Sequence, residues 1–506
     1  MDAKFEPLTG MRLLLAGAVL ALTNFMVVLD TTIANVSVAH ISGSLGISAS
    51  QGTWIITSYA VAEAICVPLT GWLAGRFGTV RTFTFGMIGF GVFSLLCGMS
   101  NSLAMLVVCR IGQGLCGGPL MPLSQTLLLR IFKPEQQAQA MGVWAMTTVV
   151  APILGPILGG TISDSWSWHW IFFINLPVAA LCAFGAFSLL RKVETPKLKL
   201  GMDGIGLALL ILWIGALQLL LDLGREHDWF NDGSMIVLAL VAFIGFVVFL
   251  VWESGERQPI VDLSVMRHRG FTVAVLSLSL TFGAFFASTV IIPQWLQSSL
   301  GYTATYAGYA TAFTGVGAVI MSPIVASLST RVDPRALVCF GILWLGFTSL
   351  LRVGWSNDAS FWVLSFPQML QGFGMPFFFI PLTTLALSAV EPEETASAAG
   401  VMSFLRTMAG AIGTSISSTL WYDNAGAARS AMVGRLNTDE TVERLTSSGW
   451  SLDQARAAVA QIVDKEAMAL ATNHIFMLAA IVFALAAFAV WLAPRPRRAV
   501  DTSAVH

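Results

Sequence analysis

The sequence predicts an all-α protein that crosses a membrane fourteen times. Of its 506 residues, 56% are hydrophobic and only 11% are charged, whereas soluble proteins carry about 25% charged residues. A transmembrane helix needs about 20 predominantly apolar residues. Fourteen stretches of this kind lie at residues 13–38, 53–73, 82–99, 102–122, 141–161, 170–190, 204–222, 235–252, 271–293, 304–328, 336–353, 360–381, 398–420 and 473–492.

The basic residues predict the orientation of these spans, because cytoplasmic connections are enriched in Lys and Arg. If the N-terminus is cytoplasmic, the connections on that side carry Lys or Arg along nearly the whole chain, and the C-terminal tail adds Arg495, Arg497 and Arg498. The short connections on the other side carry only Arg225, with Arg352 near a helix end. We therefore expect both termini in the cytoplasm.

A faint internal repeat predicts the domain organisation. Three residues recur at a spacing of 255 positions, as Pro68 and Pro323, Leu73 and Leu328, and Arg76 and Arg331. Parallel repeats of this kind are typical of transporters. We expect two six-helix halves, in residues 1–200 and 257–506, with two additional helices in residues 201–256.

One segment between spans is long and polar. Residues 422–471 fall on the side opposite the termini, and the apolar residues of 452–471 are spaced as in an amphipathic helix. Two interpretations remain open. The segment is either a cap over the last two helices or a docking surface for a partner outside the membrane.

The first four predicted spans contain three charged residues, namely Asp30, Glu63 and Arg110. A charge at membrane depth is costly and usually lines a cavity or a proton path. At 1.5 Å per residue the three lie roughly 12–16 Å from the outer side, so all could face one cavity. We expect them to couple proton movement, and Asp30 and Glu63 also to contact substrate. A purely structural ion pair is the alternative for Arg110.

Two glycine-rich segments are candidate gates. Gly71, Arg76, Gly78 and Arg81 close the second span, while Gly155, Pro156, Gly159 and Gly160 lie in the fifth. Glycine permits tight turns and close helix packing, and proline bends a helix. The alternatives are a basic anchor at the membrane surface for the first segment and a static packing seam for the second.

Other polar and aromatic side chains inside the spans could contact a flat, greasy ligand by stacking and by cation–π interaction. The candidates are Gln113, Trp144, Phe285, Gln371 and Phe378. Hydrogen bonds between helices are an equally good explanation for the glutamines, and most of the aromatic side chains will face lipid or core.

Several functions are disfavoured by the sequence. No GxxxxGK[ST] motif indicates ATP hydrolysis, and neither HExxH nor GxSxG indicates an embedded hydrolase. A net charge of -1 offers no basic surface for nucleic acid. The six cysteines lie in apolar runs without a CxxC pair, so we expect neither disulfide nor metal. We expect no cofactor beyond protons as the coupling ion.

Taken in order, several blocks resemble motifs of the major facilitator superfamily. The segment 29–36, which contains Asp30, resembles the first-helix motif of its fourteen-span drug:proton antiporters. Residues 155–160 resemble the fifth-helix motif of exporters, and residues 168–177 resemble the block that opens the sixth helix. Residues 119–129, 371–384 and 473–493 resemble the EmrB type, the inner-membrane pumps of tripartite efflux systems. The resemblance covers nearly the whole chain.

The chain departs from the superfamily pattern at Gly75, where an aspartate is usual, so the charge interaction that locks the cytoplasmic gate should be weakened or rerouted. Arg406 resembles a family position in the thirteenth span. We expect it to act in gating and to pair with a carbonyl group of the C-terminal half. Glu63 belongs to no superfamily-wide motif.

The resemblance implies the major facilitator fold and proton-driven efflux of amphipathic compounds by alternating access. It also implies a Gram-negative inner membrane, a periplasmic adaptor of the EmrA type and an outer-membrane channel of the TolC type. Three rivals remain. An uptake symporter on the same fold is opposed only by the fifth-helix motif, a membrane-embedded enzyme lacks a catalytic motif, and a receptor or scaffold would not need buried carboxylates.

Overall fold

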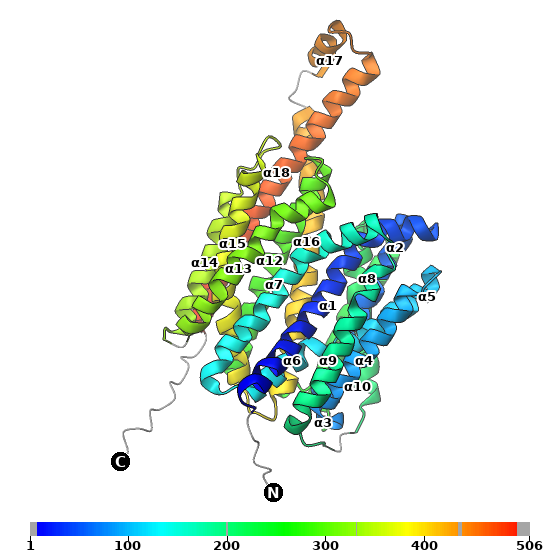
Figure 1. Cartoon of the computed structure of the whole chain (residues 1–506). Helices are drawn as coiled ribbons and strands as arrows, with labels where there is room; N and C mark the ends of the chain where they lie inside the picture. Colours follow the sequence, from blue (N-terminus) through cyan, green and yellow to red (C-terminus); the bar gives the residue numbers. More distant parts are fainter. Residues whose placement is uncertain (1–7, 199–200, 330, 434–437, 493–506) are drawn as a thin grey trace.

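The computed structural model describes residues 8–198, 201–329, 331–433 and 438–492, and it contains helices and no strands in these ranges (Figure 1). The α-helices are α1 Gly10–Leu45, α2 Ala49–Cys66, α3 Thr70–Phe77, α4 Thr79–Gly98, α5 Leu103–Gly117, α6 Leu120–Ile131, α7 Pro134–Ser165, α8 Trp170–Phe173, α9 Asn175–Leu190, α10 Gly204–Leu223, α11 Gly233–Gly255, α12 Arg269–Ser298, α13 Ala304–Ser329, α14 Pro334–Leu351, α15 Phe361–Ser388, α16 Thr395–Val433, α17 Thr438–Ser447 and α18 Leu452–Ala489.

Each of the fourteen predicted stretches coincides with one helix or with two consecutive helices. Within the described residues, eleven helices are long and apolar enough to cross a membrane, and two bent pairs raise the number to thirteen. The remaining predicted stretch is α16, in which Ser, Thr and Gly alternate with apolar residues. The predicted all-α, multi-pass membrane fold is therefore confirmed.

Two helical segments bend at or next to a proline. The axes of α2 and α3 differ by 59° across a break that contains Pro68, and α7 bends by 43° between Pro152 and Ile157. Proline lacks the N–H that an unbroken helix would use and its ring clashes with the preceding turn. The bend expected in the fifth span is thus present.

Two groups of helices stand side by side in Figure 1, α1–α9 in one and α12–α18 in the other. The long helix α7 packs against α1 in the first group and against α13 in the second. Helices α10 and α11 pack on each other, and α10 also contacts α2 and α16. A hydrogen bond from Ser415 Oγ to the Leu221 carbonyl, 3.0 Å long, ties α16 to α10.

The end at which α1 begins and α18 ends is called the basal end below (Figure 1). Near it, Gly71 of α3 packs against Ser397 of α16, and Gly400 of α16 packs against Val67 and Thr70. A basal cavity of about 1060 Å³ lies among the neighbouring connections and is lined in part by Gly71 and Ser397. The two groups of helices therefore touch at this end.

The far ends of α16 and α18 extend beyond the bundle as a projecting hairpin, with α17 near its tip (Figure 1). An exposed ion pair between Arg429 and Asp464, 2.6 Å long, joins its two arms, and Ala455, Val463 and Ala467 are buried between neighbours. The amphipathic helix expected in residues 452–471 is thus present, but it continues directly into the last span. The polar segment projects from the last two helices instead of folding over them.

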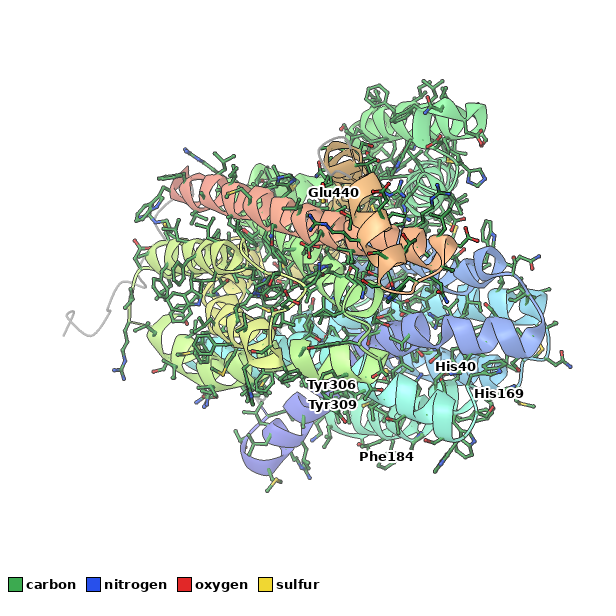
Figure 2. All side chains as sticks on the ribbon, turned by 90° about the horizontal axis from the view of Figure 1, so that it is seen from above. His40, His169, Phe184, Tyr306, Tyr309 and Glu440 are labelled. Atoms are coloured by element: carbon green, nitrogen blue, oxygen red, sulfur yellow. The ribbon has the colours of Figure 1, made fainter. Side chains whose placement is uncertain are left out.

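Apolar side chains cover the outside of the bundle. Phe184 is 72% exposed and Tyr309 is 48% exposed, and both lie at the periphery when the molecule is viewed from the end opposite the basal one (Figure 2). In a water-soluble protein such a surface would be unstable, whereas lipid chains solvate it. Glu440 of α17 lies on the projecting hairpin in the same view.

Candidate functional site

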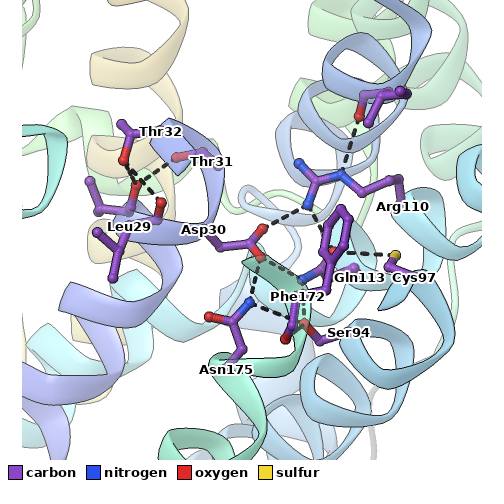
Figure 3. Close-up of polar contacts among 12 residues, drawn as sticks. Leu29, Asp30, Thr31, Thr32, Ser94, Cys97, Arg110, Gln113, Phe172 and Asn175 are labelled. Atoms are coloured by element: carbon purple, nitrogen blue, oxygen red, sulfur yellow. Dashed lines mark hydrogen bonds and ion pairs between the residues drawn. The ribbon is translucent and has the colours of Figure 1, made fainter. Parts of the chain in front are cut away.

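Asp30 and Arg110 form a buried ion pair within the first group of helices (Figure 3). Arg110 Nη1 of α5 donates to Asp30 Oδ2 of α1 across 2.7 Å, and the two residues are 1% and 2% exposed. An isolated charge would be very unfavourable here, whereas a paired and hydrogen-bonded one is tolerated. The two charges that sequence analysis selected independently are therefore direct partners.

The other carboxylate oxygen of Asp30 accepts two hydrogen bonds. Gln113 Nε2 donates to Oδ1 across 3.0 Å, and Asn175 Nδ2 donates to it across 2.6 Å. Asn175 also donates to Ser94 Oγ across 3.0 Å, and Ser94 donates to the Phe172 carbonyl across 2.9 Å. Helices α5 and α9 thus supply a set of donors that suits an ionised carboxylate, which can only accept.

Arg110 has further partners that fix its position. Its Nε donates to the Ile55 carbonyl of α2 across 3.2 Å, and its Nη1 also donates to Gln113 Oε1 across 2.8 Å. The guanidinium carbon lies 4.2 Å from the centre of the Tyr59 ring, in a cation–π contact. Because Arg110 of α5 is anchored to α2 and Asp30 belongs to α1, a change at Asp30 would alter contacts among three helices, α1, α2 and α5.

Glu63 lies on α2, one turn beyond Tyr59, and is half-buried. It forms no hydrogen bond through its carboxylate and no ion pair in the described part of the chain, but it lies within electrostatic range of Arg110, Asp30 and Arg406. The expectation that Glu63, Asp30 and Arg110 face one cavity receives no support, because Asp30 and Arg110 are enclosed by protein. Glu63 remains an accessible, uncompensated carboxylate beside their pair.

Arg406 of α16 is 2% exposed and reaches into the other half of the protein. Its Nη2 donates to Met121 Sδ of α6, and its guanidinium lies 5.2 Å from the Phe282 ring and 5.6 Å from the Phe379 ring. The expectation of a backbone carbonyl partner in the C-terminal half is wrong. The start of α6 brings a thioether to the site, and two aromatic rings make cation–π contacts with the guanidinium.

A central aromatic cluster surrounds Arg406, where α7, α12 and α15 meet. Trp144 stacks on Phe379 with ring centres 6.2 Å apart, and Phe282 lies 5.9 Å from Phe379. Phe285 and Phe378, two of the predicted substrate contacts, border this cluster at 6.3 Å and 6.2 Å from Phe282 and Phe379. The cluster therefore joins residues from both halves around one buried cation.

The polar substrate candidates already have partners inside the protein. Gln113 belongs to the Asp30 network, and Gln371 Oε1 accepts a 2.5 Å hydrogen bond from Arg352. Trp144 donates from its indole nitrogen to Ser124 Oγ across 2.8 Å. All three are fully buried. In this conformation they hold helices together, and their proposed contact with substrate stays a prediction.

The glycines of the fifth-span motif lie where α7 contacts both halves. Gly155 packs against Thr32 of α1, Gly159 packs against the Ile33 carbonyl, and Gly160 lies beside Thr305 near the start of α13. Pro156 falls between them in α7. These contacts are too close for larger side chains. The motif therefore lies where α7 packs against α1 and α13. Any movement of α1 relative to α13 would change the packing at these glycines.

The first glycine motif lies at the basal end. Gly78 has a φ of 95°, a conformation that favours glycine. Arg76 stacks on Trp72 and Phe77, with ring centres 5.7 Å and 6.0 Å away. The backbone N–H of Arg81 donates to Glu194 Oε2 across 3.0 Å. The motif thus forms a tight turn that connects α3 to α4.

Glu194 supplies a negative charge close to Gly75, the position at which the superfamily pattern has an aspartate. Its Oε1 accepts from the Val80 N–H across 2.9 Å, so both oxygens satisfy the first turn of α4. Gly75 itself accepts only a backbone hydrogen bond, from Leu198 across 2.8 Å. The carboxylate at this turn therefore comes from the segment after α9 and not from the motif.

Sequence reasoning missed Asn175, Ser94 and Tyr59, which complete the surroundings of Asp30 and Arg110. Asn175 stands in a recognised block but was given no role, although an amide at the start of a span is a usable signal. No sequence signal identifies Ser94. Within the described ranges, no group of three His, Cys, Asp or Glu side chains is placed to hold a metal ion.

The fold and the enclosed charges define a multi-pass membrane transporter built from two groups of helices. Comparison with known proteins agrees, because residues 20–414 match the model of the Major Facilitator Superfamily. The chain belongs to this superfamily and to its EmrB-type branch, which makes it a transporter and not an enzyme.

Curated relatives match nearly full length. The chain is 42% identical over 503 residues to the multidrug export protein EmrB of Escherichia coli K12, covering 97% of each chain. It is 41% identical over 497 residues to the fatty acid resistance protein FarB of Neisseria gonorrhoeae, covering 97% of this chain and 98% of that protein. The solved human organic anion transporter MFSD10 shares the fold, with a TM-score of 0.59 and 17% identity over 95% of this chain and 100% of that one.

Proposed function

We propose that this chain exports amphipathic compounds across a bacterial inner membrane in exchange for protons. The observation that carries this proposal is the enclosed Asp30–Arg110 pair, in which donors from α5 and α9 surround the carboxylate of α1. Similarity to multidrug export proteins over 97% of the chain supports the direction and the substrate class.

The Asp30 network suggests how a proton can drive the cycle. When Asp30 is ionised, its oxygens accept from Arg110, Gln113 and Asn175 and thereby connect α1 with α5 and α9. A proton on Asp30 would remove charge and one acceptor site, leaving Arg110 buried without its partner. The helices must then rearrange, and α7 transmits the movement because it packs on both α1 and α13.

Substrate would act near Glu63 and the central aromatic cluster. Glu63 is an unpaired, half-buried carboxylate suited to an organic cation, and the rings of Phe282 and Phe379 suit an apolar body. Arg406 lies within electrostatic range of Glu63 and in cation–π contact with Phe282. A change of charge or a ligand at either residue would therefore act on Arg406.

The test is drug-dependent proton flux in proteoliposomes together with the direction of drug movement in inverted vesicles. We expect the drug to accumulate in inverted vesicles. We expect Asp30→Asn to lower the coupled flux roughly tenfold or more, which corresponds to about 1.4 kcal/mol or more. Asp464→Asn, an exposed aspartate of the projecting hairpin, is the control. Full coupled flux in Asp30→Asn, or substrate movement out of inverted vesicles, would contradict the proposal.

We further propose that both termini are cytoplasmic and that the projecting hairpin contacts a periplasmic adaptor of the EmrA type, which leads to a TolC-type channel. The tip of the hairpin presents Trp450 and Leu452, each 48% exposed, beyond the bundle. The double substitution Trp450→Ser and Leu452→Ser should reduce co-purification with a co-expressed adaptor. Trp166→Ser, at an exposed tryptophan away from the hairpin, serves as control. Unchanged co-purification of the double variant would exclude this docking surface.

A further inference from the structure

A second buried arginine, Arg352, follows α14 in the C-terminal half and is 0% exposed. Its Nη2 donates to Gln368 Oε1 across 2.8 Å, to Gln371 Oε1 across 2.5 Å and to the Pro367 carbonyl across 3.3 Å. No ion pair involves Arg352 among the described residues, and its side chain is completely buried. Unlike Arg110, this cation has no carboxylate partner.

Several buried donors beside Arg352 also lack partners in the described part of the chain. They are Arg352 Nε and Nη1 and the amide nitrogens of Gln368 and Gln371. The hydroxyl groups of Ser349 and Ser365, each one turn before Arg352 or Gln368 along its own helix, are buried and unpartnered as well. Buried polar groups almost always find partners. Because nearly all of these groups donate, the missing partner must accept.

The internal repeat shows what kind of partner is missing. Identical residues recur in α4 and α14 at a constant spacing of 255 positions. At this spacing Arg352 corresponds to Cys97. The equivalent pairs are Gly86 and Gly341, Gly91 and Gly346, and Ser94 and Ser349.

Helices α5 and α15 correspond in the same way, at a spacing of 258, so that Gln113–Gly114 matches Gln371–Gly372. The packing agrees: Gly114 contacts the Tyr59 carbonyl and Gly372 contacts the Thr314 carbonyl. The hydrogen bonds agree too. Cys97 Sγ lies 3.7 Å from Gln113 Oε1, and Arg352 Nη2 lies 2.5 Å from Gln371 Oε1.

The two halves therefore present similar donors, but among the described residues only the first places a carboxylate beside them. In the N-terminal half, Gln113 and Arg110 donate to Asp30, and Gln113 also donates to the hydroxyl of Ser94. In the C-terminal half, α12, α14 and α15 contain no Asp or Glu at all. No carboxylate among the described residues therefore neutralises Arg352, and a bound anion would supply the missing negative charge.

We propose that Arg352, Gln368 and Gln371 form a binding site for a small monovalent anion of the chloride class, which replaces the carboxylate found in the first half. The site is enclosed, because the three side chains are at most 1% exposed and the rings of Trp355 and Phe476 lie 5.9 Å and 5.7 Å from the guanidinium. A site enclosed in this way excludes a drug-sized molecule.

The test compares thermal unfolding of the purified full-length protein in chloride and in gluconate at equal ionic strength. Chloride should raise the midpoint by about 2 °C or more, because a ligand that binds only the folded state stabilises it. Arg352→Gln should lose the difference between the two salts. Arg429→Gln, at an exposed arginine paired with Asp464, should keep it. Equal midpoints of the unaltered protein in both salts would overturn the proposal.

Two further measurements keep the proposal testable if Arg352→Gln does not fold. Anomalous scattering from crystals grown in bromide should place one ion beside Arg352 in the unaltered protein, and density without such a peak would count against the site. Acetate in place of gluconate asks whether a small carboxylate also binds, and stabilisation like that of chloride would support the small-anion class. Stabilisation by a carboxylate-bearing drug alone would reassign the site to substrate.

Discussion

Arg110 pairs with Asp30 across 2.7 Å and leaves Glu63, the other carboxylate near it, without an ion-pair partner among the described residues. The two acids that hydropathy singled out on equal terms are therefore physically different. Asp30 is enclosed by donors, whereas Glu63 is half-buried and its carboxylate accepts no hydrogen bond from the described residues. The first prediction follows from that difference.

Glu63→Gln should reduce export of cationic compounds more than export of neutral ones. The substitution removes the negative charge that attracts a cation but leaves the aromatic cluster around Phe282 and Phe379 intact. Resistance and transport assays with matched cationic and neutral substrates measure the effect, with Glu440→Gln of α17 as a remote control. Equal losses for both substrate types would remove Glu63 from substrate recognition.

Asn175→Leu should lower both transport and stability. The change deletes the 2.6 Å hydrogen bond to Asp30 and the 3.0 Å one to Ser94, and an unpaired buried acceptor costs about 1–3 kcal/mol. The melting temperature and the drug-driven proton flux should fall together. Asn231→Leu, at an exposed position, should change neither. Normal flux in a folded Asn175→Leu variant would show that Asn175 is not needed to position Asp30.

Gly155→Val should block transport with little loss of folded protein in the membrane. A side chain at position 155 meets Thr32 of α1, so α7 can no longer pack closely there. Gly43→Val serves as the control, because a side chain at Gly43 of α1 meets no neighbour. Transport in vesicles is the measurement, and export by Gly155→Val at the level of the control would mean that this close contact is dispensable.

Glu394 at the basal end should make stability depend on acid. It pairs with Arg267 at 2.6 Å and with His268 at 2.8 Å, which ties the connection before α12 to the one before α16. Burial would raise the pKa of Glu394, but the hydrogen bonds from His268 and from the Glu391 backbone, with the charge of Arg267, hold it below the ordinary value.

A lowered pKa in the folded state contributes stability that is complete above the ordinary glutamate pKa of about 4.3 and is lost as the pH falls through the folded value. The melting temperature of Glu394→Gln should therefore lie below that of the unaltered protein at pH 7, and the gap should close in acid. Glu443→Gln on α17 should show no such gap. A difference that stays constant when the pH is taken well below the ordinary glutamate pKa would argue against the ion pairs as its cause.

Local features of the sequence predicted the helices well. Each apolar stretch became a helix because a chain in lipid must satisfy its own backbone hydrogen bonds, and that requirement acts on every stretch separately. The bend in α7 likewise followed from Pro152 and the neighbouring glycines. The projecting hairpin was harder, because helical continuity from α16 and α18 into water depends on packing of one arm against the other.

The sequence by itself determined how many times the chain is able to cross a membrane and which residues carry charge to membrane depth, since hydropathy and charge belong to each segment. Only the tertiary structure decided which charges meet. Asn175 lies 145 residues from Asp30, and Arg406 lies 285 residues from Met121. Such pairings depend on how whole helices pack. Only the folded protein therefore shows that Arg110 pairs with Asp30 and not with Glu63, and that no carboxylate among the described residues pairs with Arg352.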